Sequence, residues 1–141
     1  MKLGFIGCGN MAKAMMGGII NSNILAANEI IASDAYQPSL DKASKELGIN
    51  VTTDNKEVAK NSEVIVLSVK PQFYAVVIEE IKDIISDSTI IVTIAPGQTL
   101  ARLHEQFGRD AKIVRCMPNT PAMVCEGMTA ACPNEFVTKD E

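Results

Sequence analysis

The most constraining feature of this sequence is a run of small residues at positions 7–12, which reads GCGNMA and matches the pattern G-x-G-x-x-A. It follows directly on a short apolar segment, residues 3–6, and opens a stretch with helical spacing of apolar residues. In such a strand–turn–helix unit the first glycine permits a tight turn, the second lets the backbone approach a pyrophosphate, and the alanine lets the helix pack against the strand. The helix N-terminus then offers free N–H groups to the phosphates. The run therefore predicts a dinucleotide-binding loop; the alternative is a glycine-rich turn that serves packing alone. The expected cofactor contacts in this loop are Gly7, Cys8, Gly9, Asn10 and Met11.

Short β-branched apolar runs alternate with helical stretches along the rest of the chain. The expected strands are 3–6, 29–33, 51–53, 64–69, 89–94 and 112–117. The expected helices are 10–21, 38–47, 73–85 and 99–107, with Gly48 closing the second. A further helix is expected to begin after Asp54, with Glu57 completing a capping box, and no element is expected in the polar tail 134–141. Continuous apolar strands are typical of a parallel sheet covered on both faces. The pattern predicts an α/β fold with a doubly wound, mostly parallel sheet, that is, a Rossmann-type NAD(P)-binding domain over residues 1–141.

Composition excludes several classes of partner. The chain has 141 residues, 47% of them apolar, and a formal net charge of −4 without any basic block. Such a chain is a poor nucleic-acid binder, because phosphate neutralisation needs clustered Lys and Arg. No run approaches the roughly 20 apolar residues that span a bilayer, and no signal peptide precedes the glycine motif, so we expect a cytoplasmic protein. The four cysteines form no Cys-x-x-Cys pair and His104, the sole histidine, is remote from them, so no metal site is expected.

An acidic residue stands where a dinucleotide site needs one. Asp34 ends the second expected strand, and a carboxylate about 20 residues after the glycines commonly accepts hydrogen bonds from the adenosine ribose of NAD. The alternative is a solvated turn residue. Ser33 could donate to a ribose 2′-phosphate, yet no arginine follows in residues 35–37. The sequence thus leaves NAD and NADP both open.

Three segments resemble pyrroline-5-carboxylate reductases. The first is residues 4–12, GFIGCGNMA, and the second is Val69-Lys70-Pro71-Gln72 after the fourth expected strand. The third and most specific is residues 115–121, RCMPNTP, continuing through Glu126-Gly127. The resemblance therefore extends over most of the chain.

The resemblance implies a nicotinamide cofactor, NADP with NAD possible, and a set of further contacts. It places Asn55 near the adenosine end and Ser33 near the 2′-phosphate. It places Asn119 close to the nicotinamide and the imine, as the substrate-proximal candidate, with a turn residue as the alternative. The segment that would line the ribose and nicotinamide comprises Ser68, Val69, Lys70 and Pro71, where Lys70 is equally consistent with a solvated strand-end charge. The chain departs from the family at Ala95-Pro96-Gly97, since Pro96 has no N–H to donate; Ala95 is kept as a contact.

Members of that family reduce 1-pyrroline-5-carboxylate to L-proline, the last step of proline biosynthesis. They continue into a helical second domain that dimerises and supplies the site for the substrate carboxylate. We therefore expect a fragment, inactive alone, whose full-length parent acts on a small molecule as a homo-oligomer. No acid–base residue can be named, and His104 is expected at a helix edge. Two rivals remain: a related imine, β-hydroxyacid or F420-linked reductase domain, and a non-catalytic dinucleotide-sensing module.

Overall fold

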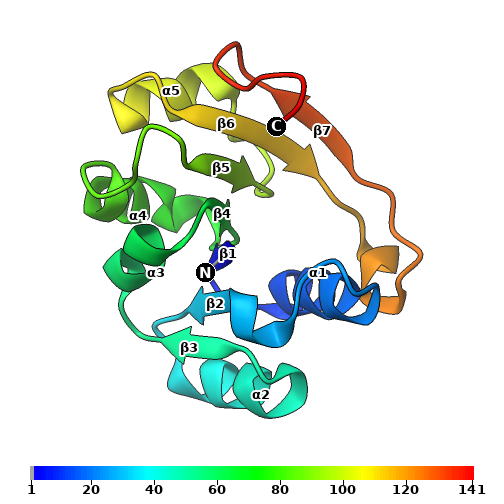
Figure 1. Ribbon diagram of the computed structural model, residues 1–141. Coiled ribbons are helices and arrows are strands. Elements are labelled where there is room, and N and C mark those ends of the chain that lie inside the picture. The colour runs from blue at the N-terminus through cyan, green and yellow to red at the C-terminus, as the bar shows by residue number, and fades with distance from the viewer. Residues whose placement is uncertain (1) are drawn as a thin grey trace.

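The computed structural model describes residues 2–141, which form a seven-stranded sheet with helices on both faces (Figure 1). The strands are β1 (Leu3–Ile6), β2 (Ile30–Ser33), β3 (Asn50–Thr52), β4 (Val64–Leu67), β5 (Ile90–Thr93), β6 (Lys112–Met117) and β7 (Ala130–Pro133). The α-helices are α1 (Asn10–Asn21), α2 (Gln37–Leu47), α3 (Asn55–Asn61), α4 (Tyr74–Ile81) and α5 (Leu100–Phe107). Short 3₁₀ turns are η1 (Ala27–Glu29), η2 (Pro71–Phe73) and η3 (Thr120–Val124). The spatial order is β3-β2-β1-β4-β5-β6-β7, with β1 to β6 parallel. This order is that of the predicted doubly wound Rossmann fold.

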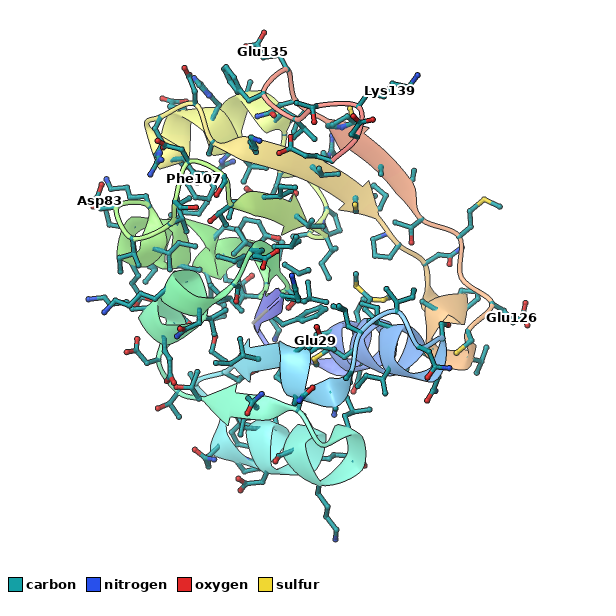
Figure 2. All side chains as sticks on the ribbon, in the orientation of Figure 1. Glu29, Asp83, Phe107, Glu126, Glu135 and Lys139 are labelled. Atoms are coloured by element: carbon teal, nitrogen blue, oxygen red, sulfur yellow. The ribbon has the colours of Figure 1, made fainter. Side chains whose placement is uncertain are left out.

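Two separate cores hold the helices on the sheet. On one face, α3, α4 and α5 pack over a cluster built on strand residues Ile6, Ile65, Ile91 and Ile113. On the other face, α1 and α2 pack over Phe5 and its neighbours. Figure 2 shows Phe107 directed into the molecule, whereas charged side chains such as Asp83, Glu126, Glu135 and Lys139 lie at the periphery. Because both faces are covered, the central strands β1 and β4 consist of apolar residues and glycine, as the sequence pattern predicts.

Gly4 sets the distance between β1 and α3. A Cβ atom at this position would lie 2.3 Å from Ser62 Oγ and 2.5 Å from Val58 Cγ1. Any side chain would therefore push the helix away from the strand. The close approach brings α3, and with it Asn55 at its first turn, next to the ends of β1 and β2.

The expected elements are present, with differences at their ends. β1, α1 and β6 have the predicted bounds, whereas α4 ends at Ile81, four residues before the expected Ile85. The residues after α4 are bound by a side chain far along the sequence. The Arg109 guanidinium donates to the carbonyls of Lys82 and Ile85, both at 3.2 Å. Those carbonyls are thus satisfied outside a regular helix.

Of the capping box predicted at the start of α3, the Asp54 cap is confirmed and the Glu57 contact is wrong. Asp54 does cap the helix, its carboxylate accepting the Lys56 N–H at 2.9 Å. The Glu57 carboxylate, however, accepts the Thr52 hydroxyl at 2.5 Å instead of reaching back to the Asp54 N–H. The Thr52 hydroxyl in turn accepts that N–H at 3.1 Å, and so takes the place of the glutamate.

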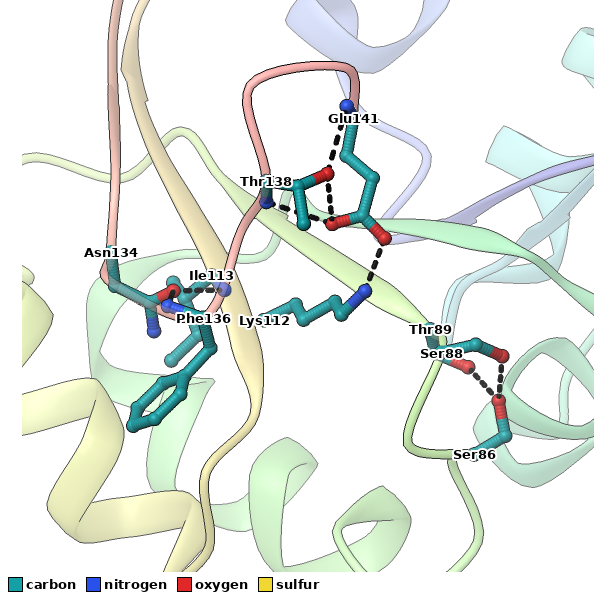
Figure 3. A network of polar contacts seen from close by, with 9 residues as sticks. All are labelled: Ser86, Ser88, Thr89, Lys112, Ile113, Asn134, Phe136, Thr138 and Glu141. Carbon is teal, nitrogen blue, oxygen red and sulfur yellow. Dashed lines mark hydrogen bonds and ion pairs between the residues drawn. The ribbon is translucent and has the colours of Figure 1, made fainter.

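The C-terminal quarter of the chain contains structure that was not expected. After β6 the chain runs beside α1 through η3 and returns as β7, which pairs antiparallel with β6 (Figure 1). Residues 134–141 then fold back over β6 (Figure 3): the side-chain oxygen Oδ1 of Asn134 accepts the N–H groups of Ile113 and Phe136, at 3.3 and 3.2 Å. The Glu141 carboxylate pairs with Lys112 and accepts the Thr138 N–H at 2.9 Å. The polar tail is therefore fastened to the sheet.

Candidate functional site

Two loops meet where the chain changes direction across the sheet, between β1 and β4. The loop after β1 begins at Gly7, and the loop after β4 begins at Ser68. The Ser68 hydroxyl donates to the Gly7 carbonyl at 2.6 Å, and the Ser68 N–H donates to the Ile6 carbonyl at 2.9 Å. Gly7 has φ 104°, and a Cβ there would lie 2.7 Å from the Ser68 carbonyl carbon. The predicted tight turn at Gly7 is confirmed, and only glycine fits it.

The loop after β2 joins them through a carboxylate. Asp34 accepts the Cys8 N–H at 2.8 Å and the Tyr36 N–H at 2.9 Å. A carboxylate can accept about four hydrogen bonds, so its oxygens keep capacity for further donors. Asp34 is thus held in place by two backbone amides at the mouth of the glycine loop.

The N-terminus of α1 is open to a ligand. The helix begins at Asn10 after Gly9, has no side-chain cap and carries no acidic residue in its first turn. The first intrahelical bond runs from the Lys13 N–H to the Gly9 carbonyl at 3.0 Å, so the amides of the first turn have no intrahelical acceptor. A Cβ at Gly9 would have no atom within 4 Å. Free amides, a positive dipole end and open space together fit a pyrophosphate.

A continuous groove runs from this helix end across the strand ends. Its phosphate end is a hollow of about 220 Å³, and its far end a hollow of about 280 Å³. The two share Gly7, Asp34, Val69 and Phe73 in their walls. A larger hollow of about 790 Å³ lies between α3 and α4, lined by residues of these helices and of the turn after α4. Since ligands of this fold bind at the carboxyl ends of the strands, we assign the site to the groove.

Most of the predicted cofactor residues line the groove. They are Gly7, Cys8, Gly9, Asp34, Asn55, Ser68, Val69 and Lys70. Asn10 and Met11 form the first turn of α1, and Pro71 begins η2. Ser33 is buried behind the groove and Ala95 lies in the core beneath α5. For all of these predicted residues, those that line the groove included, a direct cofactor contact remains a prediction.

Asn119 has a structural partner. It precedes η3, and its side-chain carbonyl accepts the Met128 N–H at 2.9 Å, which closes the loop that runs beside α1. It lies outside the residues that line the groove. Its predicted place beside the nicotinamide therefore stays a prediction.

The sequence interpretation missed one wall of the groove. Phe73, Val76, Val77 and Glu80 line its far end, and Phe73 is 52% exposed. These residues recur at spacings of three and four along η2 and α4, so they form one helical stripe. In the sequence these residues form an apolar stripe that ends in a carboxylate. Such a stripe is equally typical of a helix face that packs in the core.

Charge at the far end of the groove is predominantly negative. Among the described residues that line the groove, Asp34 and Glu80 are acidic and Lys70 is basic. Ser33, fully buried, donates its hydroxyl proton to the Asn55 carbonyl oxygen at 2.7 Å, and the Asn55 amide donates to Glu80 at 2.8 Å. Burial, and next the nearby Asp34 carboxylate, raise the pKa of the Cys8 thiol. Cys8 is therefore a neutral part of the groove floor and no thiolate nucleophile.

Within residues 2–141, no three His, Cys, Asp or Glu side chains are grouped as metal ligands would be. None of the described helices has the length and apolar character needed to cross a bilayer. His104 lies on α5, its ring stacked on Phe136 with centroids 6.0 Å apart, away from the groove.

Comparisons with known proteins agree with this geometry. Residues 2–97 match the family model described as NADP oxidoreductase coenzyme F420-dependent. The chain is 42% identical to a pyrroline-5-carboxylate reductase of Escherichia coli, over 99% of this chain and 52% of that protein. A solved pyrroline-5-carboxylate reductase from Coxiella burnetii superposes with a TM-score of 0.93 at 38% identity, covering 99% of this chain and 52% of that one. A pyrroline carboxylate reductase of Plasmodium falciparum, solved with NADP bound, gives 0.87 at 34% identity, over 99% and 50%. The chain spans about half the length of the curated relatives it matches.

Proposed function

Because this chain belongs to the family described as NADP oxidoreductase coenzyme F420-dependent, we propose that it is the NAD(P)H-binding half of a pyrroline-5-carboxylate reductase. The observation that carries the proposal is the length of sequence over which the chain is similar to a pyrroline-5-carboxylate reductase. The family match ends at residue 97, whereas the match to the Escherichia coli reductase spans 99% of the chain. It therefore takes in the region of the RCMPNTP motif at 115–121, which the rival reductases are expected to lack.

The groove supplies what the cofactor needs. The open N-terminus of α1 receives the pyrophosphate, and Asp34 receives the adenosine ribose. The loop 68–70 lines the passage toward the nicotinamide, with Lys70 as its cation. When bound, the reduced nicotinamide supplies a hydride to the imine carbon of 1-pyrroline-5-carboxylate while the ring nitrogen takes a proton, giving L-proline and the oxidised cofactor. The part of this chain is to bind and orient the cofactor.

The cofactor is proposed to be NADP(H), with NAD(H) also accepted. The relative solved with NADP bound supports the nicotinamide dinucleotide over F420. The carboxylates at the far end of the groove argue against strong selection for the 2′-phosphate. A cytoplasmic setting, where reduced dinucleotides are available, fits the proposed biosynthetic reaction.

A second, helical domain completes the proposed enzyme. Five large apolar side chains, on the segment after α1 and on the stretch from the end of β6 to β7, are exposed by 45% to 79%: Ile24, Met117, Met123, Val124 and Met128. The relatives are about twice as long as this chain, which supports a following domain that covers part of this apolar surface, dimerises and holds the substrate carboxylate.

Replacing Gly9 by valine tests the cofactor site. The side chain would fill the open space through which a pyrophosphate approaches α1, so we expect affinity for NADPH and NADH, measured by calorimetry, to fall at least a hundredfold. Gly18→Val is the matched control, because Gly18 lies on the same helix with nothing within 4 Å of a Cβ. Unchanged affinity in the Gly9 variant would contradict the site. Proline formation from pyrroline-5-carboxylate by the full-length parent, with each cofactor, tests the reaction.

A further inference from the structure

Asn55 lies between a buried hydroxyl and an exposed carboxylate, and both ends of its amide are engaged. Its carbonyl oxygen accepts the Ser33 hydroxyl at 2.7 Å, and its nitrogen donates to Glu80 at 2.8 Å. Ser33 is fully buried, and its single hydroxyl proton is donated to Asn55. The orientation of this amide is therefore fixed by Glu80 on α4.

This arrangement suits a hydroxyl better than a phosphate. A ribose 2′-hydroxyl can donate to a carboxylate, whereas a 2′-phosphate only accepts hydrogen bonds and carries close to two negative charges. At this end of the groove the Ser33 proton is already used and the Asn55 amide faces Glu80. A phosphate that takes the second N–H of the Asn55 amide lies beside the Glu80 carboxylate, which accepts the first.

Lys56 does not remove the conflict. Lys56, which follows Asn55 at the start of α3, lines the adjoining hollow together with Glu80 and also with Glu79 and Asp83. The positive charge of Lys56 is therefore surrounded by three carboxylates. Lys42, on α2, pairs with Glu46 at 3.8 Å.

We propose, on the basis of the dinucleotide-binding function above, that Glu80 determines cofactor specificity by holding the Asn55 amide and opposing the 2′-phosphate. Two like charges at about 5 Å in a water-exposed groove lower affinity severalfold, and the second phosphate charge adds as much again. Glu80 therefore lowers the affinity for NADPH relative to NADH by about tenfold, and the wild type discriminates little between them.

Charge variants at position 80 test this inference by calorimetry with NADPH and NADH. Glu80→Gln keeps an acceptor for the Asn55 amide and removes the charge, so the NADPH-to-NADH affinity ratio rises about tenfold. Glu80→Lys raises it about a hundredfold. The matched control is Glu79→Gln: Glu79 is the preceding residue on α4, its side chain is 71% exposed and pairs with Lys82 at 2.8 Å, and it lies outside the groove. Its ratio stays at the wild-type value.

The outcomes separate this inference from the function on which it rests. If both cofactors bind and the ratio is the same in wild type and Glu80→Gln, or Glu79→Gln moves it equally, Glu80 has no such role while the cofactor site stands. If Glu80 has a structural role alone, the Gln and Lys variants lose affinity for NADPH and NADH equally and the affinity ratio does not change. That result would also refute the inference. Failure of the wild type to bind either cofactor would overturn the proposed function and this inference with it.

Discussion

Tyr74 shows how a single buried group supports the groove. Its side chain is 1% exposed, and its hydroxyl donates to the Leu67 carbonyl at 2.6 Å, the last residue of β4. Burial raises the pKa of Tyr74 to about 12, so the phenol remains a neutral donor. The bond fixes the strand end from which the 68–70 loop departs.

Removing this hydroxyl is expected to cost stability. Tyr74→Phe leaves the Leu67 carbonyl buried without that donor, which lowers the free energy of unfolding by about 1–2 kcal/mol. Urea denaturation followed by circular dichroism measures the change. Tyr36→Phe is the control, since Tyr36 is 64% exposed and its variant is expected to match the wild type. A Tyr74→Phe protein as stable as the wild type would show that the carbonyl finds another donor.

At the scale of elements, what could be predicted depended on how local its cause was. β1, α1 and β6 follow from apolar runs and a glycine turn that lie within the elements themselves. β7 was missed because Ala130-Ala131-Cys132-Pro133 has no β-branched residue and ends on proline, so its strand character comes from pairing with β6. The end of α4 depends on Arg109, which is distant in sequence.

The same distinction holds for the site. The glycine loop and Asp34 were predictable because each directly follows a strand, and parallel strands bring their carboxyl ends to one edge. Asn55 and the 68–70 loop were predicted from a family resemblance. Glu80 lies on a helix, and its relation to Asn55 is a tertiary contact between α3 and α4 that no sequence spacing encodes.

The tail 134–141 is an element with a pH-dependent attachment. The hydrogen bond from Lys112, ahead of the Thr138 N–H, lowers the pKa of Glu141 from its ordinary value of 4.5 to about 2. Because the folded-state pKa is depressed, the contact stabilises the attached tail fully above about pH 4.5 and is lost as the pH falls through about 2. The Thr138 amide resonance, followed by NMR from about pH 6 down to about pH 1, is expected to report a midpoint near 2.

Glu141→Gln is the control for this titration, since it removes the carboxylate and with it the low-pH transition at Thr138. A midpoint at the ordinary glutamate value would mean that Lys112 does not hold the carboxylate in solution.

At the scale of the whole molecule, we predict that this 141-residue chain binds cofactor but does not turn over substrate. It has the cofactor groove, whereas the substrate wall and the dimer contacts are assigned to the proposed second domain. Sedimentation velocity is expected to show a monomer, and proline formation to be undetectable beside the full-length parent. A tight dimer, or turnover at a rate near the parent's, would contradict this division of labour.

The bonds that join the loops at Gly7, Ser68 and Asp34 have a consequence for how such a protein changes over time. The end of the groove at Gly7 is part of the framework of the fold. A substitution there strains the backbone or removes a hydrogen bond that joins the loops. The adenosine end rests on exposed helix positions such as Glu80, where substitutions usually change stability by about 0.5 kcal/mol or less. Cofactor choice can therefore drift, or be engineered, one surface residue at a time while the framework that binds the phosphates stays untouched.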